Sequence, residues 1–321
     1  MILYTEALPV AAPAPGSVLD PVGPDAASIA GLTWFMIALG GLLWLATVVF
    51  LVLALRHRAR RAPQRNTRGA KAFIAVWGVV IPMLVLPAVF AYSLVVGIGV
   101  SRPAPPEALD IEVVGYQFWW EVRYPDSGVV TANEVHVPVG RPVQLQLNSA
   151  DVIHSLWVPP VSGKVDLVPG RENTMTFQVD EPGTYLGECA EFCGIQHARM
   201  QFVLVAQPEE EFEEHLRTLQ LSSGTPDTDP ERAGRDVFLS ASCGDCHRIE
   251  DVSEGGMAPA PDLTHLASRD TIAAGMLENN RGNLAGWILD PQGLKPGVRM
   301  PPNNLGGDDL QALLVYLESL E

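Results

Sequence analysis

The sequence predicts a multi-domain membrane protein with three structural parts: a hairpin of two transmembrane helices, an all-β domain and an all-α domain. Two long segments in the N-terminal third carry no charged residue. A central stretch is rich in short runs of β-branched and aromatic residues, and the remainder has the periodicity of helices. A chain of 321 residues is long enough for two or three such domains.

The two uncharged segments, 29–55 and 72–100, each exceed the roughly 20 residues that a helix needs to cross a bilayer. Core helices of soluble proteins rarely stay apolar on every face, so we expect both segments to span a membrane. Trp34 and Tyr92 lie near their outer ends, where aromatic rings prefer the membrane interface. Residues 29–100 are therefore predicted to form a transmembrane hairpin.

The connector between the spans, residues 56–71, is strongly basic and holds seven of the 21 Lys and Arg. The positive-inside rule places this loop in the cytoplasm. Both termini and everything beyond the second span are then expected on the outer face of a bacterial plasma membrane. Residues 1–28 are rich in Pro and Ala, are expected to be irregular, and show no clear signal peptide.

The chain is acidic, with a formal net charge of −16. Only three of the 37 Asp and Glu precede residue 102, so the part of the chain beyond the spans is more acidic than the chain as a whole. Such a surface does not suit nucleic acid as a partner. It either attracts a basic protein at low salt or is a solvated surface that aids solubility.

Residues 101–206 are predicted to form the all-β domain. Runs such as NEVHVPV, PVQLQLNS and MQFVLVA alternate with Gly, Pro, Asp and Asn, as in a β-sandwich or Greek-key barrel. The run IEVVGYQFWWEV is expected to be one of its strands. Residues 207–229 are expected to hold an acidic helix and a linker, and residues 230–321 the all-α domain.

One short segment, GECAEFCGIQHARM, places Cys189, Cys193, His197 and Met200 within twelve residues. A disulfide is plausible outside the cytoplasm but leaves the histidine and methionine unexplained. Zinc binds thioethers poorly, and a thiol nucleophile needs one cysteine rather than two. Copper suits all four side chains, because soft sulfur and imidazole ligands select it, and two cysteines indicate more than one copper ion.

A second histidine ligand is expected from elsewhere in the all-β domain. His154, in DVIHSLWVPP, is the best candidate because it lies at the end of a predicted strand. His136, inside NEVHVPV, is expected to have a structural role or to lie at the surface.

These segments resemble subunit II of the haem–copper cytochrome c oxidases. The similarity covers about residues 28–206 and rests on CAEFCGIQHARM, DVIHSLWVPPV and GKVDLVPGR. It implies a cupredoxin-like domain that binds the dinuclear copper centre called CuA. The copper ligands that it implies in this sequence are the side chains of His154, Cys189, Cys193, His197 and Met200 and the backbone carbonyl of Glu191.

The resemblance also implies a magnesium ion, bound by the Glu191 side chain at the boundary with subunit I; the alternative is a solvated carboxylate. In the run GYQFWWEV, most of the family has a tryptophan where soluble cytochrome c delivers its electron. This sequence has Phe118 there, followed by Trp119 and Trp120, and we take these three as the candidate electron path. Phe118 is either a conservative change or the mark of a relaxed docking site.

A second motif, Cys243-x-x-Cys246-His247, has the spacing of covalent c-type haem attachment. The two thiols would bind the haem, and the histidine would reach the iron. A thioredoxin-like pair has no need of the adjacent histidine, and a zinc knuckle needs a second ligand pair, whereas only His265 follows. Haem attachment is therefore favoured.

The second axial ligand of that haem is expected to be a methionine, which raises its reduction potential. Met300 is favoured over Met257 and Met276 because it lies in KPGVRMPPNN, a Pro- and Gly-rich loop before the last predicted helix. This loop, and GRDVF before the haem motif, resemble small class I cytochromes c. That resemblance implies an all-α class I cytochrome c domain over residues 230–321.

The combination resembles subunit II of caa-type oxidases, in which a cytochrome c domain is fused to the CuA domain. It implies that electrons pass from an external donor, either a cytochrome c or a quinol-oxidising complex, through haem c and CuA to the oxygen-reducing site of subunit I. The chain would then be a non-catalytic, electron-transferring subunit of a proton-translocating cytochrome-c oxidase, with subunits I and III as partners.

The main alternative is a stand-alone membrane-anchored carrier of copper and haem. Nitrous oxide reductase has a similar copper motif but needs a larger catalytic domain than this length allows. A quinol oxidase subunit II would lack the two cysteines, which are present here.

Overall fold

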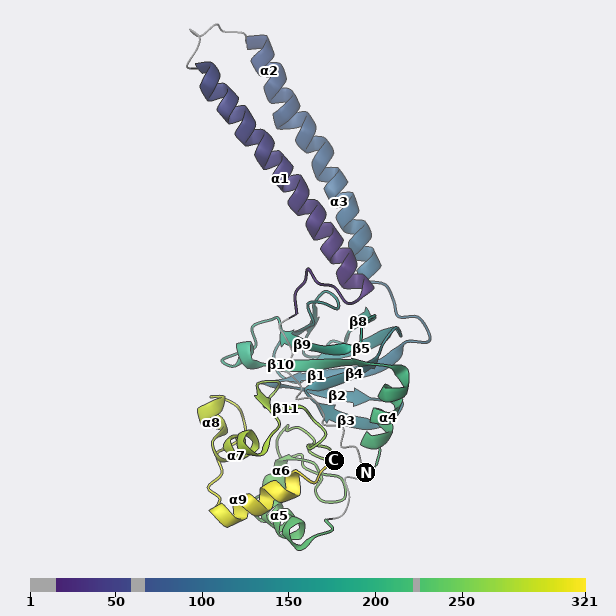
Figure 1. Ribbon diagram of the computed structural model, residues 1–321, viewed down its shortest axis with the longest axis vertical. Coiled ribbons are helices and arrows are strands. Elements are labelled where there is room, and N and C mark those ends of the chain that lie inside the picture. The colour runs from purple at the N-terminus through teal and green to yellow at the C-terminus, as the bar shows by residue number, and fades with distance from the viewer. Residues whose placement is uncertain (1–15, 59–66, 222–225) are drawn as a thin grey trace, which may run out of the picture.

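A computed structural model describes residues 16–58, 67–221 and 226–321 of the chain. A long helical hairpin stands on a β-sandwich, and a smaller helical domain lies on the side of the sandwich away from the hairpin (Figure 1). The predicted fold class is confirmed: two apolar helices are followed by an all-β domain and then by an all-α domain.

The hairpin consists of helices that carry no charged side chain over residues 29–55 and 72–100. Its elements are α1 (Pro24–Arg58), α2 (Thr67–Ala75), the π-helical turn η1 (Val76–Val80) and α3 (Ile81–Val100). The candidate spans Pro24–Arg56 and Arg68–Val100 each have a mean hydropathy of 2.5. Their most apolar parts are not buried by the rest of the described protein. Phe35 and Tyr92 meet edge to face, with ring centroids 5.4 Å apart. Side chains this apolar need lipid around them, so the hairpin anchors the protein in a membrane.

The sandwich has two five-stranded sheets. The first has the order β3-β2-β1-β5-β8, with strands Val129–Ala132, Trp119–Tyr124, Leu109–Tyr116, Val143–Ser149 and Asn173–Phe177. The second has the order β4-β10-β9-β6-β7, with strands Glu134–Pro138, Gln201–Gln207, Gly183–Cys189, His154–Trp157 and Val165–Leu167. The pairs β1–β5 and β4–β10 are parallel, and the other neighbours are antiparallel.

The aromatic run predicted as a single strand is instead a tight hairpin. β1 ends at Tyr116, β2 begins at Trp119, and these two residues pair across the turn. Side-chain oxygens hold the turn: Asp151 accepts from the main-chain N–H of Gln117 at 2.8 Å, and Asn133 accepts from that of Trp120 at 2.9 Å. No Gly or Pro marks the turn in the sequence, because these distant side chains supply the hydrogen bonds that a turn motif would supply locally.

An acidic helix, α4 (Glu209–Leu219), closes the sandwich. Pro208 precedes its first residue, and its first turn carries three glutamates, which complement the helix dipole. Phe212 and Leu219 are buried against the core of the sandwich. The predicted helix of the connecting segment is therefore part of the packed structure.

The helical domain contains α5 (Asp229–Ser240), α6 (Cys243–Cys246), α7 (Arg281–Leu289), α8 (Pro291–Leu294) and α9 (Gly307–Leu317), with a short hairpin of β11 (Thr271–Ile272) and β12 (Leu277–Glu278). Thr228 and Glu231 form a capping box that starts α5. α5 and α9 cross closely at Gly234, where any Cβ would collide with the carbonyl of Ala312. This domain has its own hydrophobic core, separate from that of the sandwich.

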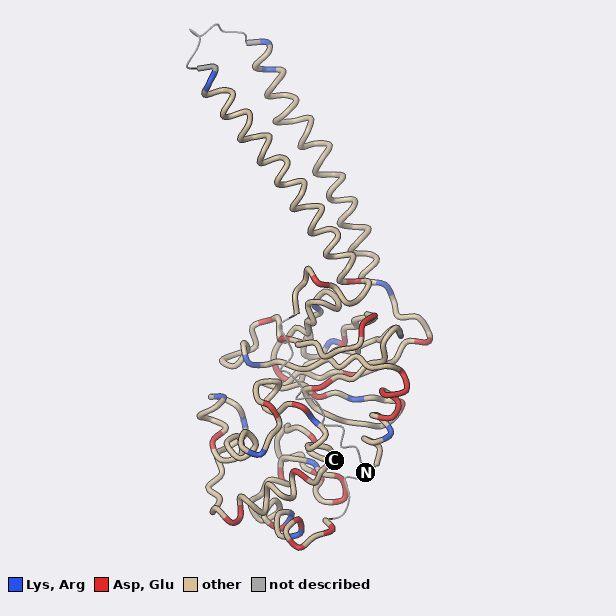
Figure 2. Tube along the Cα trace, in the orientation of Figure 1, with Lys and Arg blue, Asp and Glu red and all other residues tan. Residues whose placement is uncertain are grey.

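Charged residues are distributed unevenly between the parts. Asp and Glu are spread over the sandwich and the helical domain, whereas the basic residues of the hairpin lie at the tip farthest from the sandwich (Figure 2). Between these ends the hairpin is uncharged over residues 29–55 and 72–100.

A pair of stacked histidines joins α4 to the second sheet. The rings of His215 and His136 lie with centroids 3.7 Å apart and an interplanar angle of 17°. Burial, together with the neighbouring His136 and His265, lowers the pKa of His215 from 6.5 to about 3. The unfolded chain binds a proton here near pH 6.5, whereas the folded protein does so only near pH 3. The contribution of His215 to stability is therefore complete above pH 6.5 and is lost as the pH falls toward 3.

Replacing His215 by Phe keeps a ring on His136 but removes the titrating group. We expect the thermal midpoint of the variant to fall less than that of the wild type between about pH 7 and about pH 4. Near-ultraviolet circular dichroism of the detergent-solubilised protein measures these midpoints. Thr218→Val, on the exposed side of the same helix, is the control and should keep the wild-type pH dependence. Equal acid sensitivity of His215→Phe and the wild type contradicts this account.

Candidate functional site

Five of the predicted copper ligands converge at one end of the sandwich. His154 begins β6, Cys189 ends β9, and Cys193, His197 and Met200 follow on the loop from β9 to β10. Cys189 Sγ lies 3.7 Å from Cys193 Sγ and 3.8 Å from His154 Nδ1. Cys193 Sγ lies 3.9 Å from His197 Nδ1 and 3.8 Å from Met200 Sδ. Two thiols, two imidazoles and a thioether thus share one small volume.

These separations distinguish between the chemistries that the sequence left open. A disulfide has its sulfurs about 2.05 Å apart, so the two free thiols are not bonded to each other. Metal–sulfur bonds of about 2.3 Å and metal–nitrogen bonds of about 2.0 Å place neighbouring ligand atoms roughly 3.5–4 Å apart. The observed spacing therefore fits metal binding, and the soft donor set fits copper. The carbonyl oxygen of Glu191 adds a further donor 3.3 Å from Cys189 Sγ.

The ring of His154 is fixed by an aspartate three residues earlier. Asp151 Oδ1 lies 3.0 Å from His154 Nε2, which leaves Nδ1 directed at Cys189. Burial lowers the pKa of His154, but its hydrogen bonds to Cys189 and Asp151 outweigh burial and raise it above 6.5. A carboxylate that contacts the far nitrogen of a metal-binding histidine sets the tautomer and orientation of its ring.

The two thiols differ in acidity. The hydrogen bond from Cys193 lowers the pKa of Cys189 well below its ordinary value, and His154 adds to this effect. The same interaction, with burial, raises the pKa of Cys193. One thiolate is therefore already stabilised in the metal-free protein, and thiolates are the form that binds metal.

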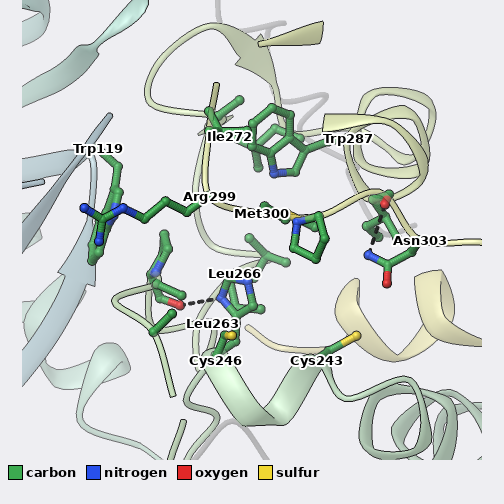
Figure 3. Close-up of a pocket in the computed structure, with 18 of the residues that line it drawn as sticks. Trp119, Cys243, Cys246, Leu263, Leu266, Ile272, Trp287, Arg299, Met300 and Asn303 are labelled. Atoms are coloured by element: carbon green, nitrogen blue, oxygen red, sulfur yellow. Dashed lines mark hydrogen bonds between the residues drawn. The ribbon is translucent and has the colours of Figure 1, made fainter. Parts of the chain in front are cut away.

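The helical domain contains an apolar cavity of about 410 Å³ beside the Cys243–His247 motif. Cys243 and Cys246 project from α6 along one side of it, and Met300 lies on the other side (Figure 3). The lining between them is apolar and includes Leu263, Leu266, Ile272, Leu284, Trp287, Ile288, Leu313 and Leu317. An apolar space bounded by two thiols, a histidine and a methionine fits a haem.

His247 is held ready to bind a metal through one nitrogen. Its Nδ1 donates to the carbonyl of Pro261 at 2.8 Å, so Nε2 is the nitrogen available to a ligand in the cavity. Burial lowers the pKa of this imidazole, which keeps it in the neutral form that binds iron.

The loop that carries Met300 is fixed by Gln292. The amide nitrogen of Gln292 donates to the carbonyls of Val298 and Met300 at 2.7 and 2.8 Å, and its oxygen accepts from the N–H of Gly297 at 3.0 Å. Met257 also lines the cavity, but it is 70% exposed. Met276 is not among the described residues that line it.

The cavity is shared between the two domains. Gln117, Phe118 and Trp119 of the sandwich belong to its lining, and Trp119 stands at its edge in Figure 3. Trp120 instead points into the core of the sandwich, where its ring meets that of His154 edge to face at 5.8 Å. Of the three aromatic residues predicted for the electron path, two face the cavity and the third packs against a predicted copper ligand.

Comparison with known proteins matches both domains. Residues 128–207 match the family described as cytochrome c oxidase subunit II, periplasmic domain, and residues 231–321 match cytochrome c. Cytochrome c oxidase subunit 2 of Alkalihalophilus pseudofirmus is 36% identical over 320 residues, which cover 95% of this chain and 91% of that protein. The Bacillus subtilis protein of the same name is 30% identical over 296 residues, 85% and 83% of the two chains.

The chain belongs to the cytochrome c oxidase subunit 2 family. It is the subunit of a haem–copper oxidase through which electrons enter, with a fused cytochrome c domain, and its two domains imply copper and haem c. Similarity over almost the whole chain disfavours the stand-alone carrier. Among solved structures, the periplasmic domain of the Bradyrhizobium japonicum subunit II is 30% identical, with a TM-score of 0.36, and covers 37% of this chain and 97% of its own.

Several residues that hold the site in this subunit 2 were missed by sequence reasoning. Asp151 orients His154, and the side chain of Gln117 donates to the carbonyl of Cys193 at 2.6 Å. Gln292 fixes the Met300 loop. Only Asp151 carried a usable signal, because its spacing of three from His154 brings the two side chains together at the start of the strand.

Replacing Asp151 by Ala removes the acceptor that orients His154 and the one that holds the N–H of Gln117. Residues that hydrogen-bond a metal-binding histidine contribute about 10–100-fold to metal affinity, so we expect the copper affinity of the variant to fall by about that factor. Competition with a copper chelator measures it. Asp166→Ala removes an exposed carboxylate from the same domain and should leave the affinity unchanged. Equal affinity in Asp151→Ala and the wild type means that Asp151 does not position the ligand.

Proposed function

We propose that this subunit 2 binds a dinuclear CuA centre through the side chains of His154, Cys189, Cys193, His197 and Met200 and the carbonyl of Glu191. The observation that carries the proposal is the 3.7–3.9 Å spacing among the five side-chain donor atoms. A copper pair held by these residues would supply one-electron redox chemistry. The rigid sandwich holds the donor atoms in place, which keeps reorganisation small when the charge changes.

In the helical domain, Cys243 and Cys246 would hold haem c covalently, with His247 and Met300 as its axial ligands. The hydrogen bond from His247 to Pro261 and the anchoring of the Met300 loop by Gln292 support these roles. The apolar walls exclude water from the cavity. A haem in such a site with a His–Met ligand pair has a raised reduction potential.

Together these assignments give an electron route from an external donor through haem c and CuA to the oxygen-reducing site of subunit I. The donor is a cytochrome c or a quinol-oxidising complex, and subunit III completes the assembly. The side chain of Glu191 would bind magnesium at the subunit I boundary. The family membership supports this placement in the complex.

The orientation in the membrane follows from charge. The basic tip of the hairpin would lie in the cytoplasm, with both termini and both redox domains on the outer face. The domain limits that we propose for this arrangement are an N-terminal segment 1–28, a hairpin 29–100, a copper domain 101–206, a connector 207–229 and a cytochrome c domain 230–321. Helix α1 of the hairpin begins somewhat earlier, at Pro24.

Phe118 stands where most of the family has a tryptophan, and this difference fits an electron donor that belongs to the same chain. Phe118 is only 5% exposed, and the helical domain shares the cavity with it, so a soluble protein cannot reach this residue in the docked arrangement. We therefore favour a relaxed external docking site over a conservative change. Phe118, Trp119 and Trp120 would lie between the haem and the copper site.

The copper assignment predicts about two copper ions per chain and their loss in Cys193→Ser, because one bridging thiolate is removed. Metal analysis and electron paramagnetic resonance of the purified complex measure this. Cys246→Ser is the matched control: it removes a cysteine from the haem motif, so it should impair haem attachment but keep the copper. Zinc in the wild-type site, or full copper in Cys193→Ser, contradicts the assignment.

The axial-ligand assignment predicts that Met300→Leu keeps the covalent haem but changes its spin state or lowers its potential, because the axial ligand tunes the iron. Optical spectra and a redox titration of the complex measure both properties. Met257→Leu alters the exposed methionine at the same cavity and should leave them unchanged. If Met257→Leu changes the spectrum and Met300→Leu does not, the assignment belongs to Met257.

A further inference from the structure

Lys295 is buried between the two domains. Its side chain is 1% exposed, and its Nζ donates to the carbonyl of Phe118 in the sandwich at 3.1 Å and to that of Ala273 in the helical domain at 2.8 Å. The other two lysines of the chain, Lys71 and Lys164, are exposed. Burial lowers the pKa of Lys295 to about 7, which shows that the ammonium group pays a desolvation penalty here. A residue that only filled space at this position would be apolar, so its amine has a specific role.

The residues on either side of Lys295 bind the copper-ligand loop. Arg199 donates to the carbonyl of Leu294 at 2.9 Å, and the side chain of Gln196 donates to that of Pro296 at 2.7 Å. Gln196 and Arg199 are adjacent in sequence to His197 and Met200, both proposed copper ligands. The haem domain therefore contacts the loop beside the ligands themselves.

The acceptor of Lys295 in the sandwich leads directly to a copper ligand. Phe118 is bonded to Gln117, and the Gln117 side chain donates to the carbonyl of Cys193 at 2.6 Å. One chain of covalent and hydrogen bonds thus runs from Lys295 through Phe118 and Gln117 to Cys193. On the haem side, Lys295 belongs to the loop that Gln292 ties to Met300.

The second acceptor of Lys295 lies on a strained segment. Ala273 and Ala274 have φ angles of 55° and 60°, in the left-handed region that side chains other than glycine rarely adopt. In this conformation the carbonyl of Ala273 accepts from Lys295, and that of Ala274 accepts from the N–H of Gln201 in β10 at 3.1 Å. Such conformations are unfavourable for alanine and persist where surrounding contacts or function require them. Both carbonyls therefore accept hydrogen bonds at the contact between the domains.

We propose that Lys295 is a positioning residue that locks the haem domain onto the copper domain for electron transfer from haem c to CuA. The proposal rests on the ligands assigned under the proposed function. In this step haem c loses one electron and the copper pair gains it, and no covalent bond is made or broken. Lys295 belongs to the lining of the haem cavity but is not one of the proposed ligands of either centre. It acts through Phe118 and Gln117 on one side and through the Met300 loop on the other.

The test uses the intact oxidase complex with Lys295→Met, which keeps the length of the side chain but removes its donors. Rapid reduction of haem c followed by absorbance measures the rate of its re-oxidation by copper. We expect this rate to fall about tenfold or more, because the docked arrangement becomes a minor state without the two buried hydrogen bonds. Copper content, haem content and the optical spectra of both centres should stay as in the wild type. Lys164→Met, an exposed lysine of the copper domain, is the control.

Unchanged spectra and metal content with a slower rate indicate lost positioning, since damage to the ligands of either centre would change its spectrum. An unchanged rate with both centres loaded overturns the proposal. If Lys295→Met loses haem or copper, the same rate is measured in Arg199→Ala, because the exposed Arg199 side chain makes the neighbouring contact with Leu294. Slower electron transfer in Arg199→Ala supports the proposal, and transfer at the wild-type rate overturns it. Absence of copper from the wild-type complex instead overturns the proposed function, and metal analysis shows this separately.

Discussion

The ring of His154 has almost no freedom of movement, and the arrangement of both redox sites follows from this. Gly115 faces one side of the ring, and a Cβ there would lie 2.9 Å from His154 Cδ2. Trp120 packs edge to face against it, and Asp151 holds its outer nitrogen. A ligand that is immobile before any metal arrives gives a site whose geometry changes little with charge. Asp151 also holds the turn between β1 and β2, so the constraint that fixes this ligand also fixes the surface that meets the helical domain.

That surface orients the two fused domains relative to each other. α4 ends at Leu219 and α5 begins at Asp229, so the connection between the domains is short. A tether of this length keeps a domain at an effective concentration of about the millimolar range, which brings it near its site but does not orient it. Orientation comes from the hydrogen bonds at the copper-ligand loop and from Thr271, whose N–H donates to Glu134 at 2.9 Å. The tether and the contacts thus have separate tasks.

The fold class could be predicted, and the candidate ligands could be proposed, because their signals are local in the sequence. Charge-free segments, short alternating runs and two ligand motifs each lie within a few tens of residues. β3 and β7 have only four and three residues, too few for alternation to be seen. The supporting contacts were out of reach for another reason: Gln117 and Cys193 are 76 positions apart, and Lys295 and Phe118 are 177 apart. Polar residues at such separations have no spacing rule, so only the folded chain brings them together.

Phe118 and Trp119 close one side of the cavity, so the two faces of the helical domain are under different constraints. The inner face must fit one unchanging surface within its own chain, so substitutions there are tolerated only in matched pairs. The outer face meets whichever donor the cell provides and is free to diverge. A lineage that adopts a new electron donor can therefore remodel this outer face while the copper site and its supporting turn stay as they are. The fusion separates the choice of donor from the construction of the metal centre.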